Sequence, residues 1–231
     1  MSHMLGAFVN AGAIFVGGLA GLLFGKLLNK KVGDAVMLGL GLVVSYIGFS
    51  GSLSGKHTLV AIVSMALGAV IGTLLKLEDR IRALGAWLER KVSKGDSGTF
   101  AKGFVSASLL FCVGAMAITG PLDSGLRNDH TTQYVKAVID GIGAVVFASN
   151  LGAGVLFSAL CILVYQGGIT LLAGFVAPFL TDVIIGEMTC VGSLLILALG
   201  MNMLGMTKLK VMDYVPAVFL PILLCHIPIL L

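Results

Sequence analysis

The chain has 231 residues, of which 58% are hydrophobic and only 11% are charged. Soluble globular proteins have about 25% charged residues, so this composition excludes an ordinary soluble domain. The net charge of +4 comes from short charged segments that alternate with long uncharged runs. The sequence therefore predicts an all-α polytopic membrane protein, with residues 1–231 forming a single membrane domain.

The N-terminal residues 1–3 precede a second methionine, Met4, and we interpret them as an expression scar. The first apolar run starts directly afterwards, at Leu5, with no basic segment before it. A secretory signal peptide has such a basic segment, so we expect an uncleaved first membrane span instead.

Crossing the hydrocarbon core takes about 20 apolar residues, so uncharged runs of at least about 18 residues predict membrane spans. Residues 4–76 contain three spans, residues 100–150 contain two and residues 151–231 contain three. The uncharged run 141–181 is too long for one helix, and we divide it at 149–154 into two. The eight predicted spans are Leu5–Gly25, Ala35–Gly55, Thr58–Leu75, Gly103–Leu122, 132–149, 153–175, Met188–Thr207 and Tyr214–Leu231, the last kinked by Pro216.

The positions of the basic residues favour eight spans over the alternative of seven, in which 132–149 does not cross the membrane. Lysines follow the first span, an Arg/Lys-rich interval follows the third, and Lys208 and Lys210 follow the seventh. With eight spans all of these clusters lie on one side, which the positive-inside rule makes cytoplasmic. Both termini then face away from the cytoplasm, and the expected location is the bacterial cytoplasmic (inner) membrane.

The charged interval 77–99 is predicted to be a cytoplasmic amphipathic helix, Leu77–Val92, followed by a flexible linker, Ser93–Thr99. Apolar residues recur on one stripe of the helix, whereas its arginines, Glu89 and Lys91 lie away from that stripe. Such a helix either lies at the membrane interface or serves as a packed connector without a lipid role.

A weak internal repeat relates spans 1–3 to spans 6–8. Gly33-Asp34 begins the second span and Gly186-Glu187 begins the seventh, and each acid is followed five residues later by a glycine. Five helices separate the equivalent spans, so the two halves would be inverted in the membrane. Inverted repeats are typical of secondary transporters, with the substrate site at the repeat interface.

Ionisable and amide side chains inside spans are costly and are therefore candidates for function. Asp140 is the strongest candidate, with Lys136 one turn earlier; the alternative is an ion pair that only holds the helix in place. Asn150 lies at the predicted break between two helices, and Glu187 lies at a span entrance. The predicted transport path consists of Asp140, Asn150, Glu187, Asn202, Asn10, Lys136 and Gln166, although each amide could instead join neighbouring helices.

The polar stretch 122–130 follows a break of the fourth span at 114–121 and forms either an exposed loop or part of an entrance. Its candidate entrance residues are Asp123, Asp129 and His130. These three are a weak signal for a metal site, and none is predicted. Glycines 17, 21 and 25 form two GxxxG steps, for which we favour an internal helix contact over a dimer face.

Other classes of function have no support in the sequence. The motifs of hydrolases, zinc proteases, nucleotide-binding loops and dinucleotide-binding folds are absent, so no enzyme activity and no cofactor are predicted. The sequence also lacks a basic groove with interleaved aromatic residues, which argues against nucleic acid as a partner. The four cysteines lie in apolar runs without CxxC spacing and are interpreted as reduced, buried residues.

The run Gly103–Ile118 and the polar positions that follow it resemble the YqgA/YdfK-type bacterial membrane proteins, domain of unknown function 554. The positions that carry the resemblance are Asp123, Gly125-Leu126, Asp129-His130, Lys136, Asp140-Gly141, Tyr165-Gln166-Gly167, Glu187-Met188-Thr189 and Asn202. The resemblance extends from Leu5 to the C-terminus. It implies a bacterial membrane location and supplies no activity or substrate.

Two functional hypotheses follow. In the first, the protein is a transporter or channel for an ion or a small polar solute, whose path lies at the interface of the two inverted halves. Asp140 is then the group expected to titrate if transport is coupled to protons or cations. In the second, it is a non-transporting scaffold or sensor that acts through the cytoplasmic helix. The lipid bilayer is the expected partner, and homo-oligomerisation is compatible with so small a chain.

Overall fold

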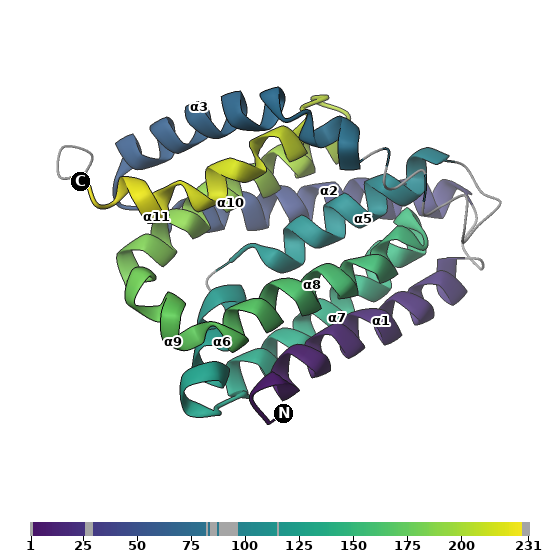
Figure 1. The fold of residues 1–231 in the computed structure, drawn as a ribbon. Helices are drawn as coiled ribbons and strands as arrows, with labels where there is room; N and C mark the ends of the chain where they lie inside the picture. Colours follow the sequence, from purple (N-terminus) through teal and green to yellow (C-terminus); the bar gives the residue numbers. More distant parts are fainter. Residues whose placement is uncertain are drawn as a thin grey trace. The chain divides into compact units, whose positions relative to one another are not determined.

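The structure, a computed structural model, describes residues 2–25, 30–81, 83, 87, 97–114 and 116–227, and every regular element in these residues is helical (Figure 1). The all-α prediction is therefore confirmed. The helices gather into two compact units, a division that the prediction of one membrane domain did not include. Helix α2 belongs to the first unit up to Val36 and to the second from Met37.

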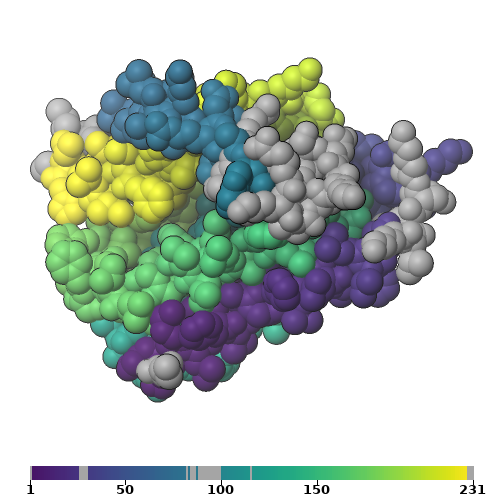
Figure 2. Space-filling model, turned by 45° about the vertical axis from the view of Figure 1, so that its right-hand side comes forward, coloured from purple at the N-terminus to yellow at the C-terminus, as the bar shows by residue number. Residues whose placement is uncertain are grey.

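The first unit contains most of the helices from the middle of the chain. Its elements are η1 (Ser2–Met4), α1 (Leu5–Gly25), α5 (Ser97–Cys112), α6 (Met116–Arg127), α7 (Thr131–Leu151), α8 (Gly154–Leu171) and α9 (Ala173–Val176). The short η2 (Ala177–Phe179) leads out of it. Figure 2 shows the residues of α8 directly alongside those of α1.

The glycine stripe of α1 packs against α7. A Cβ atom on Gly17 would collide with the carbonyl oxygen of Gly141, and one on Gly21 would collide with that of Val145. The next glycine of the stripe makes the same kind of contact with an α7 carbonyl one turn later. The contacts advance in the same order along both helices, so α1 and α7 run parallel with their backbones in close contact. The internal helix contact expected from the GxxxG steps is confirmed.

The turn between α7 and α8 reverses the chain where the sequence predicted a break. Gly152 has φ +74°, a left-handed conformation that a residue with a Cβ atom adopts only at a cost. Because of this reversal, α8 returns antiparallel to α1, with Leu156 beside Gly18. Helix α5 also runs antiparallel to α7, with Phe111 against Phe147 at a centroid distance of 6.5 Å.

The second unit consists of two antiparallel helix pairs. Its elements are α2 (Lys30–Ser52), α3 (Thr58–Leu74), α10 (Asp182–Met203), η3 (Val211–Phe219) and α11 (Pro221–Leu224). A Cβ atom on Gly48 would collide with the backbone of Leu197 in α10. One on Gly68 would collide with the backbone of Ala217 in η3. Both pairs therefore depend on glycine for their close approach.

Several helices are long and apolar enough to cross a membrane. Among the described residues there are five, or six if α5 and α6, which meet at a 61° bend, form one broken span. The segment 132–149, which does not cross the membrane in the seven-span alternative, belongs to one of the five, α7. The third and eighth predicted spans correspond to shorter apolar helices, Thr58–Leu74 and Val211–Leu224.

The predicted boundaries differ from the observed ones at several places. The polar stretch 122–130 is not a loop for most of its length, because α6 continues to Arg127. The break of the fourth span lies at Gly114, the first residue of the predicted break at 114–121, where φ is +116°, and α6 has already begun at Met116. Ser97–Thr99 of the predicted linker form the start of α5, and serine is a residue that favours helix starts; residues 93–96 lie outside the described residues.

A further difference concerns the C-terminal span, which is a 3-10 helix followed by one α-helical turn. Pro216 and Pro221 have no N–H group and therefore cannot donate the hydrogen bonds of a continuous α-helix. The end of the predicted span, residues 228–231, lies outside the described residues.

The predicted cytoplasmic helix 77–92 is described only in part. Residues 77–81, 83 and 87 are helical. Its first turn is joined to the start of η3 by two reciprocal hydrogen bonds. Asp213 Oδ1 accepts from the backbone N–H of Glu78 at 2.9 Å, and Glu78 Oε2 accepts from that of Met212 at 3.3 Å. Each carboxylate thus lies at the positive end of the other helix.

Candidate functional site

Four of the predicted path residues come together inside the first unit. Lys136 and Asp140 project from the inward face of α7, Asn10 from α1 and Gln166 from α8. All four are buried, with Asn10 and Gln166 at 0% exposure. The close contacts of α1 with α7 and α8 bring together side chains that lie as much as 156 residues apart in the chain.

The centre of this cluster is a buried ion pair. Lys136 Nζ lies 2.8 Å from Asp140 Oδ1 and 2.7 Å from Oδ2, so the ammonium contacts both carboxylate oxygens. Asn10 Nδ2 donates to Asp140 Oδ2 and to Gln166 Oε1, both at 3.0 Å. Removing two charges from water costs several kcal/mol per ion unless the pair and its hydrogen bonds compensate. The pair is therefore stable only while these partners remain in place.

Several polar atoms in and beside the cluster have no hydrogen-bond partner among the described residues. They are Asn10 Oδ1, Gln166 Nε2, Thr170 Oγ1 one turn beyond Gln166, and Gln133 Nε2 one turn before Lys136. A buried polar group without a partner costs about 1–3 kcal/mol. Both donors and acceptors are left open, which is the combination that water or a small polar solute can satisfy.

The inward face of α7 changes character along its length. Toward its N-terminal end it carries Gln133 as well as the ion pair. Toward its C-terminal end the buried residues are Ala144, Phe147, Ala148 and Leu151. Buried polar residues thus extend from the cluster to the N-terminal end of α7, which lies near α6. Apolar side chains fill the C-terminal half of the same face.

A second polar network lies at the polar end of α7. The buried Ser124 hydroxyl of α6 donates to Gln133 Oε1 at 2.6 Å, and His130 Nδ1 lies 3.0 Å from the same hydroxyl oxygen. His3 Nδ1 lies 3.1 Å from the Ser124 carbonyl oxygen. Sequence reasoning missed Ser124 and Gln133, although the spacing of 133, 136 and 140 places three polar residues on one helix face.

The candidate entrance residues have separate roles around this network. His130 joins the network, whereas Asp123 pairs with Arg127 at 3.4 Å on the surface of α6. Asp129 Oδ1 accepts a hydrogen bond from the backbone N–H of Thr131 at 2.9 Å, which holds the pKa of Asp129 below its ordinary value. No group of three or more His, Cys, Asp or Glu side chains that could hold a metal ion occurs in the described residues.

The remaining path candidates do not join the cluster. Asn150 lies at the opposite end of α7, where its Nδ2 donates to Val146 O and Ser149 Oγ. Asn202 lies in the second unit and holds the turn after α10. Its Oδ1 accepts from the Leu209 N–H at 2.9 Å and its Nδ2 donates to Leu209 O at 2.8 Å.

Glu187 also lies in the second unit, and it is not at a span entrance as predicted. Helix α10 begins earlier, at Asp182, because Thr181 accepts a hydrogen bond from the Ile184 N–H as its N-cap. Glu187 is thus inside the helix and 1% exposed, with Oε1 accepting from the backbone N–H groups of Lys56 and His57 at 2.7 and 2.9 Å. Its carboxylate caps the N-terminus of α3 from a neighbouring helix.

Comparison with known proteins gives consistent results. A family model described as "Protein of unknown function (DUF554)" matches residues 5–226. The chain is 31% identical over 222 residues to "Uncharacterized membrane protein YdfK" of Bacillus subtilis (strain 168), covering 94% of both chains. It is 26% identical over 221 residues to "Uncharacterized protein YqgA" of Escherichia coli (strain K12), again covering 94% of both. No solved structure matches the chain.

Proposed function

Since the chain belongs to the DUF554 family of membrane proteins, we propose that it is a transporter or channel for an ion or a small polar solute. The observation that carries this proposal is the buried Lys136–Asp140 pair and the unpartnered polar atoms around it. Charged side chains within membrane spans are retained where they line a path for ions or solutes. The proposed location is the bacterial cytoplasmic membrane, and no enzyme activity is part of the proposal.

The hydrogen-bond inventory of the cluster favours a path over a purely structural ion pair. A structural pair is most stable when every donor and acceptor around it is satisfied. Here Asn10, which bonds Asp140, and Gln166, which bonds Asn10, each leave one amide atom open. Water or a solute that fills these positions would be displaced and replaced easily, as conduction requires.

Eight spans form part of this proposal, and the directions of the helix contacts support them. With eight alternating spans, α1 and α7 are the first and fifth spans and run parallel, as their glycine contacts require. Three further pairs, α1 with α8, α2 with α10 and α3 with η3, are antiparallel, as the same alternation requires.

The inverted repeat of spans 1–3 and 6–8 is also proposed. It equates α1 with α8, α2 with α10, and α3 with η3, and each of these helices packs antiparallel against its equivalent within one unit. An inverted repeat in which equivalents meet would give this arrangement. The Asn10–Gln166 hydrogen bond then lies where one half meets the other, and Asp140 enters from α7 between them.

Ion and solute flux into proteoliposomes tests the proposal. Vesicles that contain the full chain are assayed for H⁺, Na⁺, K⁺ and Cl⁻ in turn. For any ion that is transported, Asp140→Asn should reduce the rate by at least about tenfold, which corresponds to ~1.4 kcal/mol of lost charge stabilisation. The matched control is Asp123→Asn, which changes a carboxylate on the surface of α6. Equal flux in wild type and Asp140→Asn would refute the assignment of the path.

A further inference from the structure

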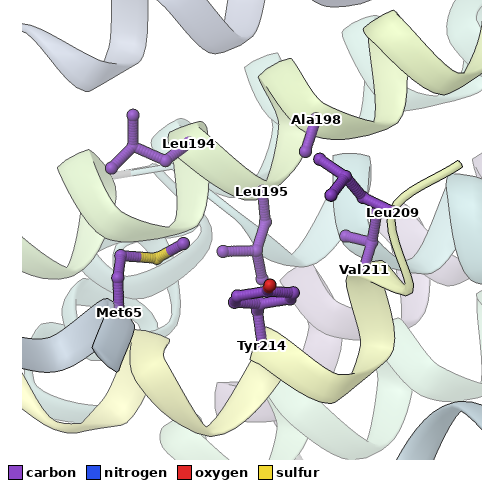
Figure 3. Close-up of a pocket in the computed structure, with 7 residues that line it drawn as sticks. All are labelled: Met65, Leu194, Leu195, Ala198, Leu209, Val211 and Tyr214. Atoms are coloured by element: carbon purple, nitrogen blue, oxygen red, sulfur yellow. The ribbon is translucent and has the colours of Figure 1, made fainter. Parts of the chain in front are cut away.

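The second unit contains an apolar hollow that the proposed transport path does not use. Its volume is about 180 Å³, and it lies between α3, α10 and the chain that leads into η3 (Figure 3). The lining residues are Met65, Leu194, Leu195, Ala198, Leu209, Val211 and Tyr214. Met65 and Leu194 lie on one side of the space in Figure 3, and Leu209 and Val211 lie on the other.

The turn after α10 keeps this hollow open. Gly205 has φ +74°, which reverses the chain after the helix, and the Asn202 amide fixes Leu209 by two hydrogen bonds. The small side chain of Ala198 leaves space where a larger one would fill the gap. Leu195 and Val211 are almost fully buried, but Leu209 is 44% exposed, so the hollow is open on the side of the turn.

Positive charge flanks the open side. Lys208 and Lys210 are exposed and lie on either side of Leu209 in the chain. Lys210 Nζ is 3.9 Å from Asp79 Oδ1, and both side chains are more than half exposed, so the pair is weak. The nearby carboxylates of Glu78 and Asp213 are occupied by backbone N–H groups. The lysines therefore remain available to an external anion.

We propose that this hollow binds an anionic phospholipid of the cytoplasmic leaflet, with part of one acyl chain inside it and the phosphate at Lys208 and Lys210. The positive-inside rule places this lysine turn at the cytoplasmic surface, where anionic lipids attract basic residues. The volume of about 180 Å³ is below the roughly 300–1,000 Å³ typical of pockets for small solutes, which favours a chain segment.

Lipid titration of the full chain by native mass spectrometry tests this site. The probes are phosphatidylglycerol, phosphatidylcholine with the same acyl chains, and glycerol 3-phosphate. Phosphatidylglycerol should bind most tightly. The double variant Lys208→Gln, Lys210→Gln should weaken it about twenty-five-fold, because each lysine near an anionic surface contributes about fivefold. Two control variants should bind phosphatidylglycerol like wild type. The first is Lys56→Gln, which changes a lysine at the other end of the second unit. The second is the double variant in which Lys208 and Lys210 are replaced by arginine.

Three outcomes would overturn the proposal. Equal affinity for phosphatidylglycerol and phosphatidylcholine would exclude the role of the lysines. Equal affinity for phosphatidylglycerol and glycerol 3-phosphate would show that the acyl chain does not contribute to binding. The hollow itself is tested without substitution by a phosphatidylglycerol that carries a photoreactive group on its chain. Its label should appear on Ala198, Leu209 or their neighbours in the hollow, and labelling confined to other segments would contradict the assignment.

Discussion

The Lys136–Asp140 pair can be tested as a buried interaction because the chain contains an exposed pair with the same spacing. Both Lys136–Asp140 and Asp123–Arg127 join residues four apart on one helix. The side chains of the first pair are 8% and 5% exposed, whereas Arg127 and Asp123 are 77% and 34% exposed. A double-mutant cycle on each pair therefore compares two ion pairs of the same helix spacing in two environments.

The expected magnitudes follow from burial. Lys136→Met leaves Asp140 with the Asn10 amide as its remaining hydrogen-bond donor, and we expect a loss of ~3–5 kcal/mol in the free energy of unfolding. Asp140→Asn alone leaves a buried ammonium and should cost a similar amount. Combining the two substitutions removes both charges and should restore most of the stability, which gives a coupling of at least about 3 kcal/mol. The exposed pair should show about 0.3–0.5 kcal/mol.

Equilibrium unfolding of the full chain from mixed micelles supplies the four free energies for each cycle. The reasoning fails if the coupling of the buried pair is as small as that of the exposed pair. Such a result would mean that the folded protein solvates an unpaired Lys136 or Asp140 charge about as well as bulk water does.

Three further predictions concern stability. Gly21→Leu should destabilise by ~1–3 kcal/mol in the same unfolding assay, because the added side chain meets the Val145 carbonyl, whereas Gly12→Ala, which enters open space, should not destabilise. Glu187→Ala should cost ~1–3 kcal/mol and accelerate hydrogen exchange of the two amides ahead of α3, whereas Glu187→Gln should lose less. Because the folded-state pKa of Asp129 lies below the ordinary 3.8, its ionised form stabilises the fold above that pH, and this contribution is lost as the pH falls through the lower value.

The controls for these predictions are direct. Gly12 lies on the same helix as Gly21, so equal losses in the two variants would contradict the packing argument. Unchanged amide exchange in Glu187→Ala would exclude its role as a cap. For Asp129, the stability difference between wild type and Asp129→Asn should shrink at acidic pH, and a constant difference would contradict the hydrogen-bond explanation.

Local patterns were enough to predict the helices whose ends carry their own signals. The apolar run of α1 and the Gly152 turn both lie where the sequence placed them. Helix α10 was predicted to start too late because hydropathy counts Asp182 and Glu187 against a span. In the structure, the first occupies the favourable N-terminal turn and the second finds backbone donors in another helix.

The sequence was enough to predict which residues belong to the candidate site, but not which of them lie close together. Asn10, Lys136 and Asp140 stand out in the sequence as polar residues inside apolar runs. Their proximity to one another depends on contacts between helices that are distant in the chain, and no local pattern reports these contacts. For the same reason Asn202 was assigned to the path, although its amide serves a turn seven residues away.

The parallel packing of α1 against α7 has a consequence for biogenesis. The partner of Asn10 on α7 is Asp140, 130 residues later in the chain. At a synthesis rate of about 5–20 residues per second, the ribosome needs about 6–26 s to add that segment. During this interval the glycine stripe of α1 faces lipid or the insertion machinery. Helix α1 is thus synthesised well before its contacts with α7 can form, and its stability in the membrane during this interval depends on what covers the glycine stripe until α7 arrives.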